Sequence, residues 1–445
     1  MGKIADFKSL AGINTWESIT PDAHGDWLRQ RDDSFSQFVV MGDKKSDGLK
    51  LFDSFSLGLG TNRDTWAYNS SKTKLQENMS NMIAFYNMEL KRFNEAHSDA
   101  DKKAREAKVG SFIDSSPERI SWTRSLKQEI VKNKIARFDS GSAKHSLYRP
   151  FTKQWVYFNR KLNEYVFLMP SIWPDACVDN FVICTAGVGA RAGFSVFMAK
   201  TLTDLHTLDT GQCFPLYLYD EAVQTTKTDL FAEPVEGGLR RRDAITDAGL
   251  GHFTAAYPGE QISKEDLFYY VYGLLHSPDY LERFADNLGK ELPRIPAVKK
   301  AADFWAFSNA GRDLANLHLN YETVEPYPLA IEAKGTLTEA DYRVEKMKFA
   351  KKGDKTTVIY NSRITLKGIP DAAWDYVVNG KAALDWVMER QAVRTDKASG
   401  IVNDANDWAC ETMGNPKYPL ELFQRVVTVS LETQKIVNSL PPLDI

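Results

Sequence analysis

Residues 154–159 read QWVYFN, and this run sets the pattern for the middle of the chain. Val, Phe, Tyr, Trp and Ile are the residue types that strands favour, and turn residues separate each run from the next. The sequence therefore predicts a β-rich region over about residues 142–220. The runs are QWVYFN (154–159), EYVFLM (164–169), NFVICT (180–185), FSVFMA (194–199) and PLYLYD (215–220).

Helical patterns come before this region. Over residues 72–107, apolar side chains recur at steps of three and four, which places them on one face of a helix. The charged end of this helix, residues 94–108, is expected to fray or to project into solvent. A second helix is predicted from SSPERISW (115–122), because Ser116 is a good N-cap and Pro117 suits the first helical position.

The second half of the chain returns to helices over about residues 244–320, where Ser263 and Asp266 form a plausible capping box. The last part, about residues 340–445, combines a small sheet with helices. Its strands are predicted in YRVEKMKFA (342–350) and TTVIYN (356–361), and its helices at about 380–392 and 418–436. Because strands and helices come in separate blocks, the pattern predicts an α+β fold and not a doubly wound one.

The composition is that of an ordinary globular protein. The chain has 445 residues, 43% hydrophobic and 26% charged, with a net charge of −3. A nucleic-acid partner would therefore have to be met by a local patch of positive charge. The four cysteines form no CxxC pair, which argues against a zinc site or a disulfide framework and fits the reducing cytoplasm. No apolar run approaches the roughly 20 residues of a membrane span, so no membrane partner is expected.

Positive charge gathers in one segment, residues 115–161. Eleven Lys and Arg residues stand there against three acidic residues, a local charge of +8, and aromatic residues are interleaved with them. Clustered cations of this kind bind phosphate oxygens and release counterions, so the segment is a candidate nucleic-acid surface. The alternative is a solvated helix face above core aromatics. The candidate contacts in this segment are Lys127, Lys132, Lys134, Arg137, Lys144, Tyr148, Arg149, Thr152, Lys153 and Gln154.

Two glycine-containing stretches also carry arginines. In AGVGARAGFS (186–195), the glycines follow a predicted strand, but another strand follows them, so a hairpin loop with Arg191 at its tip is favoured over a cofactor site. EGGLRRR (236–242) is either a basic arm that DNA orders or a surface loop ahead of a helix near Asp243. Its candidate contacts are Arg240, Arg241 and Arg242.

No catalytic constellation is found. The seven histidines make no HxxxH or HExxH motif, and neither GxSxG nor GxxxxGK[ST] occurs. NPKYP (415–419) only partly matches the Asn-Pro-Pro-Tyr motif with which adenine methyltransferases hold a flipped base, and a turn leading into a helix is the better interpretation. A binding or specificity module is therefore favoured over an enzyme.

Several longer runs closely resemble the C-terminal part of Type ISP restriction-modification enzymes, and the resemblance covers nearly the whole chain from Trp16. The runs are FDSFSLGLGTNRDTWAYNSS (52–71), SLYRPFTKQWVYFN (146–159), DLHTLDTGQCFPLYLYD (204–220), residues 266–296, residues 303–329 and SGIVNDANDWA (399–409). These single-chain, ATP-dependent enzymes join a nuclease, a helicase-like ATPase, a coupler, an adenine-N6 methyltransferase and a target-recognition domain. The chain looks like the last of these domains, because the catalytic motifs of the others are absent from it.

The resemblance implies that this domain binds double-stranded DNA sequence-specifically and so directs adenine-N6 methylation and ATP-dependent cleavage. Residues 1–70 would link it to the methyltransferase domain, its second partner, and residues 71–445 would form the domain itself. No cofactor is expected in this chain; AdoMet, ATP and Mg²⁺ would serve the full-length enzyme.

The resemblance also marks particular residues. Thr61, Asn62 and Arg63 of the GTNRD motif are expected either to contact the DNA backbone or to brace the methyltransferase, unless Arg63 only pairs with a nearby acid and fixes the turn. For Tyr148 and Arg149, the alternative to a DNA contact is a buried polar network under the sheet. Apart from the resemblance, the β-rich part is expected to present loops to the major groove, where Thr152, Lys153, Gln154 and Arg191 are candidate readers of bases or positioners.

Two other classes of protein stay open at this stage. One is a docking module that binds the rest of its own enzyme and has little affinity for DNA. The other is a catalytic methyltransferase fragment, which the missing AdoMet loop disfavours.

Overall fold

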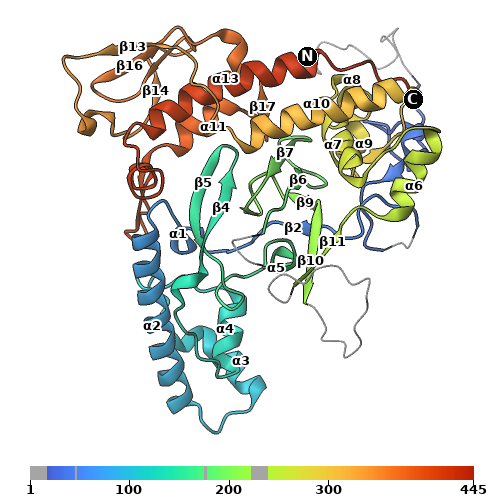
Figure 1. The fold of residues 1–445 in the computed structure, drawn as a ribbon. Coiled ribbons are helices and arrows are strands. Elements are labelled where there is room, and N and C mark those ends of the chain that lie inside the picture. The colour runs from blue at the N-terminus through green and yellow to red at the C-terminus, as the bar shows by residue number, and fades with distance from the viewer. Residues whose placement is uncertain (1–17, 46–47, 175–177, 222–238) are drawn as a thin grey trace, which may run out of the picture.

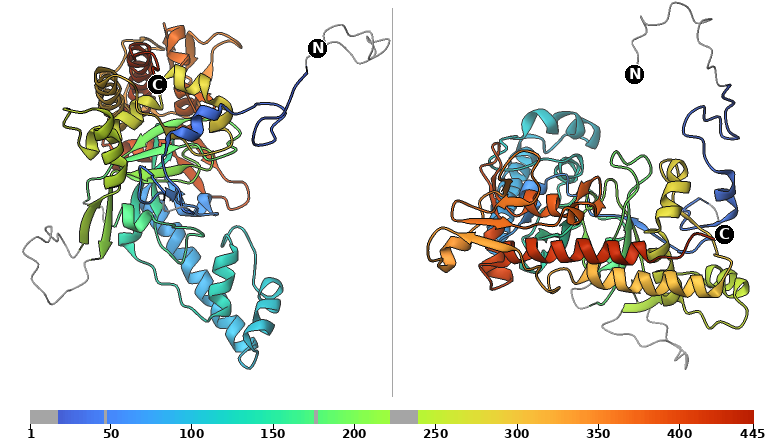
Figure 2. Two further views of the ribbon diagram at one scale, coloured as in Figure 1. Left: turned by 90° about the vertical axis from the view of Figure 1, so that its right-hand side faces the viewer. Right: turned by 90° about the horizontal axis from the view of Figure 1, so that it is seen from above.

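The computed structural model describes residues 18–45, 48–174, 178–221 and 239–445. In this part of the chain, helices and several small sheets occur in blocks along the sequence, which confirms the predicted α+β fold. A body of sheets and helices carries a helical arm that projects from it (Figures 1 and 2). Of the helices within these ranges, none has the length and apolar character of a membrane span.

The arm consists of α2 (Lys72–Ala96), α3 (Lys102–Phe112) and α4 (Arg124–Val131). It has its own hydrophobic core, in which Leu75, Met79 and Phe93 of α2 are fully buried. The prediction of one helix over 72–107 was wrong, because the polar residues after Ala96 interrupt it. Asp101 then begins α3, since its carboxylate accepts the backbone N–H of Ala104 (2.7 Å).

The second predicted helix starts later than expected. Residues 117–119 form a turn, and α4 begins after Thr123, whose hydroxyl accepts the backbone N–H of Leu126 (3.3 Å). Thr123 is therefore the N-cap instead of Ser116. The helix also ends at Val131, so Lys132 is its C-cap and Lys134 lies beyond it.

Two four-stranded sheets form the middle of the body, and most of the predicted runs supply their strands. The first sheet has the order β2 (Ser56–Leu57), β9 (Gln212–Pro215), β6 (Val182–Thr185), β7 (Val196–Ala199). The second has the order β3 (Tyr68–Asn69), β5 (Thr152–Tyr157), β4 (Ala143–Arg149), β8 (Leu202–Thr203).

The run EYVFLM is the exception among the predicted strands. Its last residue begins the short helix α5 (Met169–Ile172), where Pro170 occupies the first turn. Proline suits that position because it has no backbone N–H to leave unpaired. An isolated bridge pairs Tyr165 of this run with Gly60, and both residues lie outside the strands.

A helical layer covers these sheets, and the long helices α10 and α13 lie side by side across the body (Figures 1 and 2). Ser263 and Asp266 make the predicted capping box at the start of α7. Helices α7 and α10 approach each other at two glycines, since a Cβ on Gly273 or Gly311 would lie 2.1 or 1.9 Å from a carbonyl oxygen of the other helix. The helices of this layer are α6 (Asp247–Ala256), α7 (Lys264–Leu274), α8 (Pro278–Arg283), α9 (Ala285–Leu288), α10 (Ala301–Leu319) and α13 (Tyr418–Asn438).

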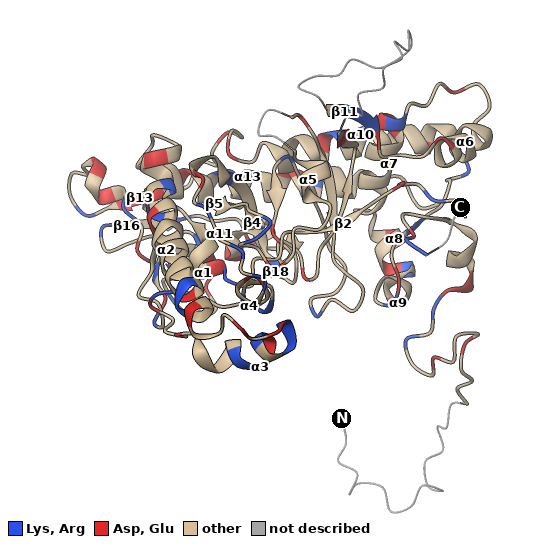
Figure 3. Ribbon diagram, turned by 90° about the horizontal axis from the view of Figure 1, so that it is seen from below, with Lys and Arg blue, Asp and Glu red and all other residues tan. Residues whose placement is uncertain are grey.

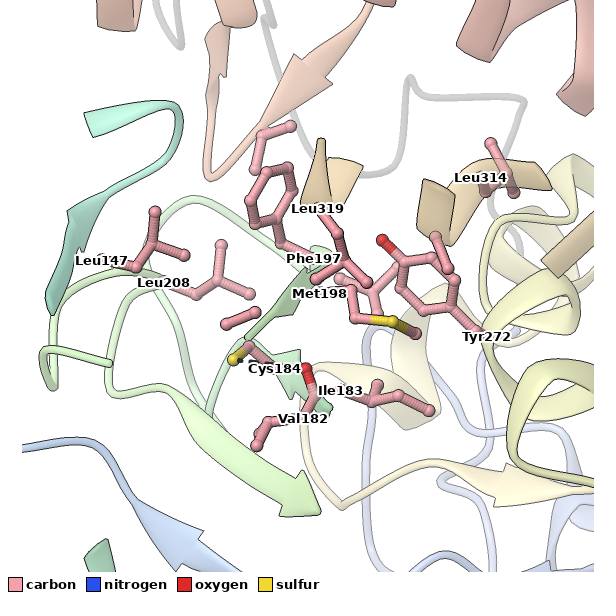
Figure 4. Close-up of a cluster of buried hydrophobic side chains, with 14 of the residues drawn as sticks. Leu147, Val182, Ile183, Cys184, Phe197, Met198, Leu208, Tyr272, Leu314 and Leu319 are labelled. Atoms are coloured by element: carbon pink, nitrogen blue, oxygen red, sulfur yellow. Dashed lines mark hydrogen bonds between the residues drawn. The ribbon is translucent and has the colours of Figure 1, made fainter. Parts of the chain in front are cut away.

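The core of the body lies between this layer and the sheets. Phe197 of β7, Ile183 of β6 and Tyr272 of α7 are all fully buried there (Figure 4). This core is separate from that of the arm.

The C-terminal part builds a third sheet and several ribbons of two strands. The third sheet has the order β13 (Ala330–Ala333), β16 (Ile364–Lys367), β15 (Thr357–Ile359), β14 (Lys348–Phe349), so only two residues of YRVEKMKFA are in a strand. The ribbons are β17 (Val377–Val378) with β18 (Lys381–Ala382), β19 (Val393–Thr395) with β20 (Val402–Asp404), and, from earlier in the chain, β10 (Tyr217–Glu221) with β11 (Leu239–Asp243). Helix α11 (Ala383–Arg390), helix α12 (Ala405–Asp407) and a π-helix (Trp408–Thr412) complete this part.

Most of the described residues from Asp33 to position 70 pack into the body, whereas residues 18–30 are largely exposed. Strand β1 (Val39–Val40) pairs with β12 (Arg294–Ile295), and β2 pairs with β9. Phe52 and Leu59 are fully buried in the core of the body. The domain boundary at residue 70 stays a prediction, but much of the predicted linker is part of the body's core.

Candidate nucleic-acid interface

The GTNRD motif forms a tight turn that leads into the short helix α1 (Asp64–Ala67), at the place where the arm meets the body (Figure 1). Asn62 has a left-handed backbone (φ 51°), which asparagine tolerates better than most residues. The Thr61 hydroxyl donates to Asp64 and accepts the backbone N–H of Arg63 (3.1 Å). Thr61 and Arg63 are buried, and Asn62 is exposed.

Arg63 ties this turn to the arm. Its Nη2 donates to Thr123 Oγ1 (2.7 Å), the hydroxyl that caps α4. The side chain is only 4% exposed, and its Nε and Nη1 have no hydrogen-bond partner among the described residues. Burial lowers the pKa of Arg63 to about 10. Its position indicates a brace between arm and body, and the predicted contact with DNA or with a methyltransferase stays a prediction.

Arg149 and Tyr148 belong to a polar network under the second sheet, which was the alternative to a DNA contact. Arg149 Nη1 donates to Asp204 Oδ1 (2.7 Å), and its Nη2 lies 3.6 Å from Asp64 Oδ2. The Tyr148 hydroxyl donates to Asp64 Oδ2 (3.1 Å), and the Arg149 guanidinium lies 3.9 Å from the centre of the Tyr148 ring. Burial raises the pKa of Asp204 to about 7, although the guanidinium of Arg149 opposes this rise.

The three candidates on β5 are also turned inward. Thr152 and Gln154 are buried, and Gln154 Oε1 accepts from Asn403 Nδ2 (3.3 Å). Lys153 is mostly buried and forms an ion pair with Glu322 at the end of α10. Contact between these three side chains and DNA bases stays a prediction. In this structure the three side chains are mostly or fully buried.

Three adjoining hollows surround the turn, and together we call them the arm cleft. The first (about 450 Å³) lies between the GTNRD turn, the segment before α4 and the loop that starts at Asp204. The second (about 290 Å³) and the third (about 650 Å³) continue it along the β19–β20 hairpin and along α2. The lining mixes polar and apolar side chains and carries both signs of charge. It includes Asn62, Thr65, His206, Asp396 and Ser399 in the first hollow, Arg390, Arg394 and Asn403 in the second, and Lys74, Asn78, Asn81 and Arg119 in the third.

The cations of residues 127–144 lie on the arm and at its base. Lys132, Lys134 and Arg137 are exposed, and Lys127 and Lys144 are half-buried. Backbone contacts hold this segment against α2, since Tyr86 donates to the Lys134 carbonyl (2.7 Å) and Asn87 bonds both backbone groups of Ala136. Lys132 pairs with Glu129 (3.1 Å), whereas no ion pair of Lys134 or Arg137 is seen within the described ranges.

The basic segment therefore does not make one continuous positive surface. Arg149 and Lys153 are buried against carboxylates, while Lys134 and Arg137 point to solvent. Positive and negative residues are interspersed along α2, whereas α3 carries four Lys and Arg residues and one Glu (Figure 3). A DNA contact at Lys127, Lys132, Lys134, Arg137 and Lys144 stays a prediction, which their location permits.

The remaining predicted arginines lie elsewhere on the body. Arg191 is at the tip of the loop between β6 and β7, which are antiparallel, so the predicted hairpin is confirmed. Arg240 and Arg241 are exposed on β11, and Arg242 pairs with Asp53 (2.8 Å) and Asp220 (2.7 Å). The earlier residues of EGGLRRR, Glu236 to Gly238, lie outside the described residues.

The arm cleft also contains residues that the motif search passed over. Arg390, Arg394 and Asn403 come from the C-terminal part and line the second hollow. The only sequence signal for this region was the run SGIVNDANDWA, because it resembles the family and includes Asn403. Asp204 and Asp209, which hold Arg149 and Arg191, lie in another such run, DLHTLDTGQCFPLYLYD.

No metal centre is seen in the part of the chain that the structure describes: no three His, Cys, Asp or Glu side chains are grouped so that they could hold an ion. The glycines of residues 186–195 lie between two antiparallel strands, so they do not form the strand-to-helix turn of a dinucleotide site. Asn415 precedes α13, as the interpretation of NPKYP as a helix-leading turn predicted.

Comparison with known proteins identifies the family. A model of the Type ISP C-terminal specificity domain matches residues 50–422. A nuclease-deletion mutant of the Type ISP restriction-modification enzyme LlaGI, solved in complex with a DNA substrate mimic, is 34% identical, with a TM-score of 0.83 over 99% of this chain and 37% of that one. The ATP-dependent Type ISP enzyme LlaBIII, solved bound to DNA, is 33% identical, with a TM-score of 0.82 over 96% of this chain and 25% of that one.

A third solved structure, the DrdV–DNA complex, is 30% identical, with a TM-score of 0.76 over 98% of this chain and 42% of that one. A comparison with curated proteins gave no match. The fold and these matches define a specificity domain of restriction-modification enzymes, and the chain belongs to the Type ISP C-terminal specificity domain family, as its sequence predicted. It spans between 25% and 42% of the length of the three solved chains.

Proposed function

We propose that this chain recognises a specific sequence in double-stranded DNA on behalf of a longer Type ISP restriction-modification enzyme. The observation that carries the proposal is its family: the matching model is that of a specificity domain, and the three similar solved proteins were all captured with DNA or a DNA mimic. The recognised site would determine where the parent enzyme methylates adenine and triggers ATP-dependent cleavage.

The exposed cations support this function physically. Lys134 and Arg137 are exposed without a carboxylate partner in the described structure, so they are free to replace counterions along a phosphate backbone. Such contacts position a protein on DNA, and base contacts from other loops then select the sequence.

The chemistry of the parent enzyme is assigned to its other parts. This chain corresponds to at most 42% of the similar solved chains. AdoMet, ATP and Mg²⁺ would then be used outside it, and a methyltransferase domain would be its intramolecular partner. Calorimetry of this chain with AdoMet should show no binding; a measurable affinity would instead favour a catalytic methyltransferase fragment.

The direct test is fluorescence anisotropy with two duplexes of equal length. One has a random sequence, and the other is obtained by repeated selection on the chain from a library with a randomised centre. The selected duplex should bind more tightly than the random one, and both affinities should fall linearly with the logarithm of salt concentration. Equal affinity for both duplexes after selection would refute sequence-specific recognition.

One observation favours a second function, docking within the parent enzyme. Near the start of the described residues, Trp27 is 61% exposed and Leu28 is 73% exposed, and large apolar side chains of this kind often mark protein contacts. In that case the chain alone would bind neither duplex, and it would associate with a separately produced methyltransferase part of the enzyme. Trp27→Ala should weaken that association.

A further inference from the structure

Three loops meet around Arg191 on the surface of the body. They are the β6–β7 loop, the segment from Asp204 to Gly211 and the turn between β17 and β18. Two glycines allow this close contact. A Cβ on Gly187 would lie 2.2 Å from Thr210 Oγ1, and one on Gly380 would lie 2.8 Å from the Cβ of Ala192. The loop that carries Arg191 is therefore packed against its neighbours.

Arg191 is exposed, yet its guanidinium is held in one orientation. Its side chain is 90% exposed. The backbone N–H and Nε donate to Asp209 Oδ2 (3.0 and 3.2 Å), and Nη2 donates to Asp209 Oδ1 (3.3 Å). The carboxylate thus takes the edge formed by Nε and Nη2. The adjacent edge, formed by Nη1 and the second N–H of Nη2, has no hydrogen-bond partner among the described residues and is available as a fork of two donors.

Asp209 is itself fixed from two sides. Its backbone N–H donates to Asn379 Oδ1 (2.9 Å), and its carbonyl accepts the N–H of Gly187 (2.9 Å). Asn379 in turn donates its backbone N–H to Ser195 Oγ (2.9 Å). The carboxylate that orients Arg191 is only 13% exposed and belongs to a connected network, so little freedom is lost when the guanidinium meets a ligand.

We propose that Arg191 reads a guanine in the major groove through this free edge, and that Asp209 is its positioning residue. The inference rests on the proposed function. A fork of two parallel N–H donors matches the O6 and N7 acceptors of guanine. A phosphate is a poorer partner at this place, because the Asp209 carboxylate would lie beside it and repel it. The edge of a base carries no net charge, so the same carboxylate can stay in position.

The test is selection of duplexes from a library with a randomised centre, by this chain and by four variants. The wild-type chain should enrich sequences with a guanine at one fixed position. With Arg191→Ala, the preference for that guanine should fall by about tenfold or more, while preferences at other positions persist. Asp209→Asn should weaken the preference at the same position only. Arg363→Ala, which removes an arginine paired with Asp341 (3.6 Å) on the third sheet, is the matched control and should change nothing.

Arg191→Lys separates a base contact from a phosphate contact. Lysine keeps the charge but lacks the planar fork, so the guanine preference should weaken while the dependence of affinity on salt is unchanged. If Arg191→Ala instead weakens binding to all sequences alike and lowers the salt slope by about 1, Arg191 is a phosphate contact and the inference is overturned, although the proposed function stands. An unaltered guanine preference overturns it too. If the wild-type chain enriches no sequence, both the inference and the proposed function fail.

Discussion

The joint between arm and body and the outer surface of the arm take their cations from the same basic segment, yet they use them differently. At the joint, the mostly buried Arg149 donates from Nη1 to Asp204 Oδ1 (2.7 Å). This bond links β4 to a loop 55 residues further along the chain. On the arm, Lys134 and Arg137 are exposed without a carboxylate partner in the described ranges. The comparison teaches that partner carboxylates, supplied from distant parts of the chain, decide whether a cation serves the fold or remains available to a ligand.

The largest effect is expected from Arg149→Ala. The change leaves Asp204, only 2% exposed, without its closest cation, and breaking a buried ion pair costs about 4 kcal/mol. Without the guanidinium, the pKa of Asp204 should rise above its present value of about 7. An Asp in the unfolded chain loses its proton near pH 4, whereas Asp204 in the folded variant keeps its proton to above pH 7. The free energy of unfolding should therefore fall as pH rises from about 4 to above 7. Urea unfolding at several pH values measures both effects.

A double variant distinguishes the interaction energy between Arg149 and Asp204 from the stability lost when a large side chain is replaced. Arg149→Met together with Asp204→Asn removes both charges, so the loss of stability should be clearly less than the sum of the two single losses. Strictly additive losses would show that the two groups do not stabilise each other, and the contrast between joint and arm surface would then fail.

The cores of the two regions also differ, which predicts a response to acid. Among its described residues, the arm buries the charged side chains of Glu89 and Arg105 but no histidine, whereas the body buries His276 and His318 between its helices. Burial lowers the pKa of His276 to about 4. An unfolded histidine takes up a proton near pH 6.5, so His276 makes the fold less stable as pH falls from about 6.5 to 4, by up to about 3 kcal/mol.

The variant His276→Asn tests this contribution. Asparagine can keep the hydrogen bond that Nδ1 makes to the Tyr272 carbonyl (2.8 Å), but it does not titrate. The difference in unfolding free energy between variant and wild type should therefore change in favour of the variant on acidification. Asp204, whose raised pKa acts in the opposite direction, is present in both proteins and cancels in this difference. A difference that is constant between pH 7 and pH 4 would contradict the prediction.

Much of the fold could be predicted because its signals are local. The strand runs NFVICT and PLYLYD, the capping box at Ser263 and the last helix all follow from neighbouring residues. Two features that the prediction missed also have local causes. EYVFLM has strand residue types but leads into α5 at Pro170, and the arm helices divide where polar residues interrupt the apolar face. Exposure at the candidate site depended on contacts far apart in sequence: Lys153 is buried because Glu322 lies beside it, and nothing near Lys153 in the sequence shows this.

A smaller loss of stability is expected from Arg63→Met. Arg63 lies at the same joint as Arg149 but has no carboxylate partner in the described structure, so the two variants test what the partner contributes. Arg63 is more deeply buried than Arg149, but it has one side-chain hydrogen bond, to Thr123, and no ion pair in the described structure. Replacing an uncompensated buried charge by an apolar chain of similar length is often neutral. The change in unfolding free energy should therefore stay below about 1 kcal/mol. A loss as large as that of Arg149→Ala would show that burial alone, and not the carboxylate partner, makes a cation essential to the fold.

The smallest effect on stability, and a clear one on binding, is expected from Lys134→Ala combined with Arg137→Ala. Surface changes away from packed features usually alter the unfolding free energy by less than about 0.5 kcal/mol. If both residues contact phosphates, affinity should fall alike for all duplexes, and the salt slope should decrease by about 2.

Lys132 is left in place because its pairing with Glu129 would complicate the result. Lys352→Ala, which removes one exposed cation near the third sheet, is the control and should leave the slope unchanged. An unchanged slope in the double variant would remove this face of the arm from the DNA interface, whereas a marked loss of stability would mean that these cations, like Arg149, serve the fold.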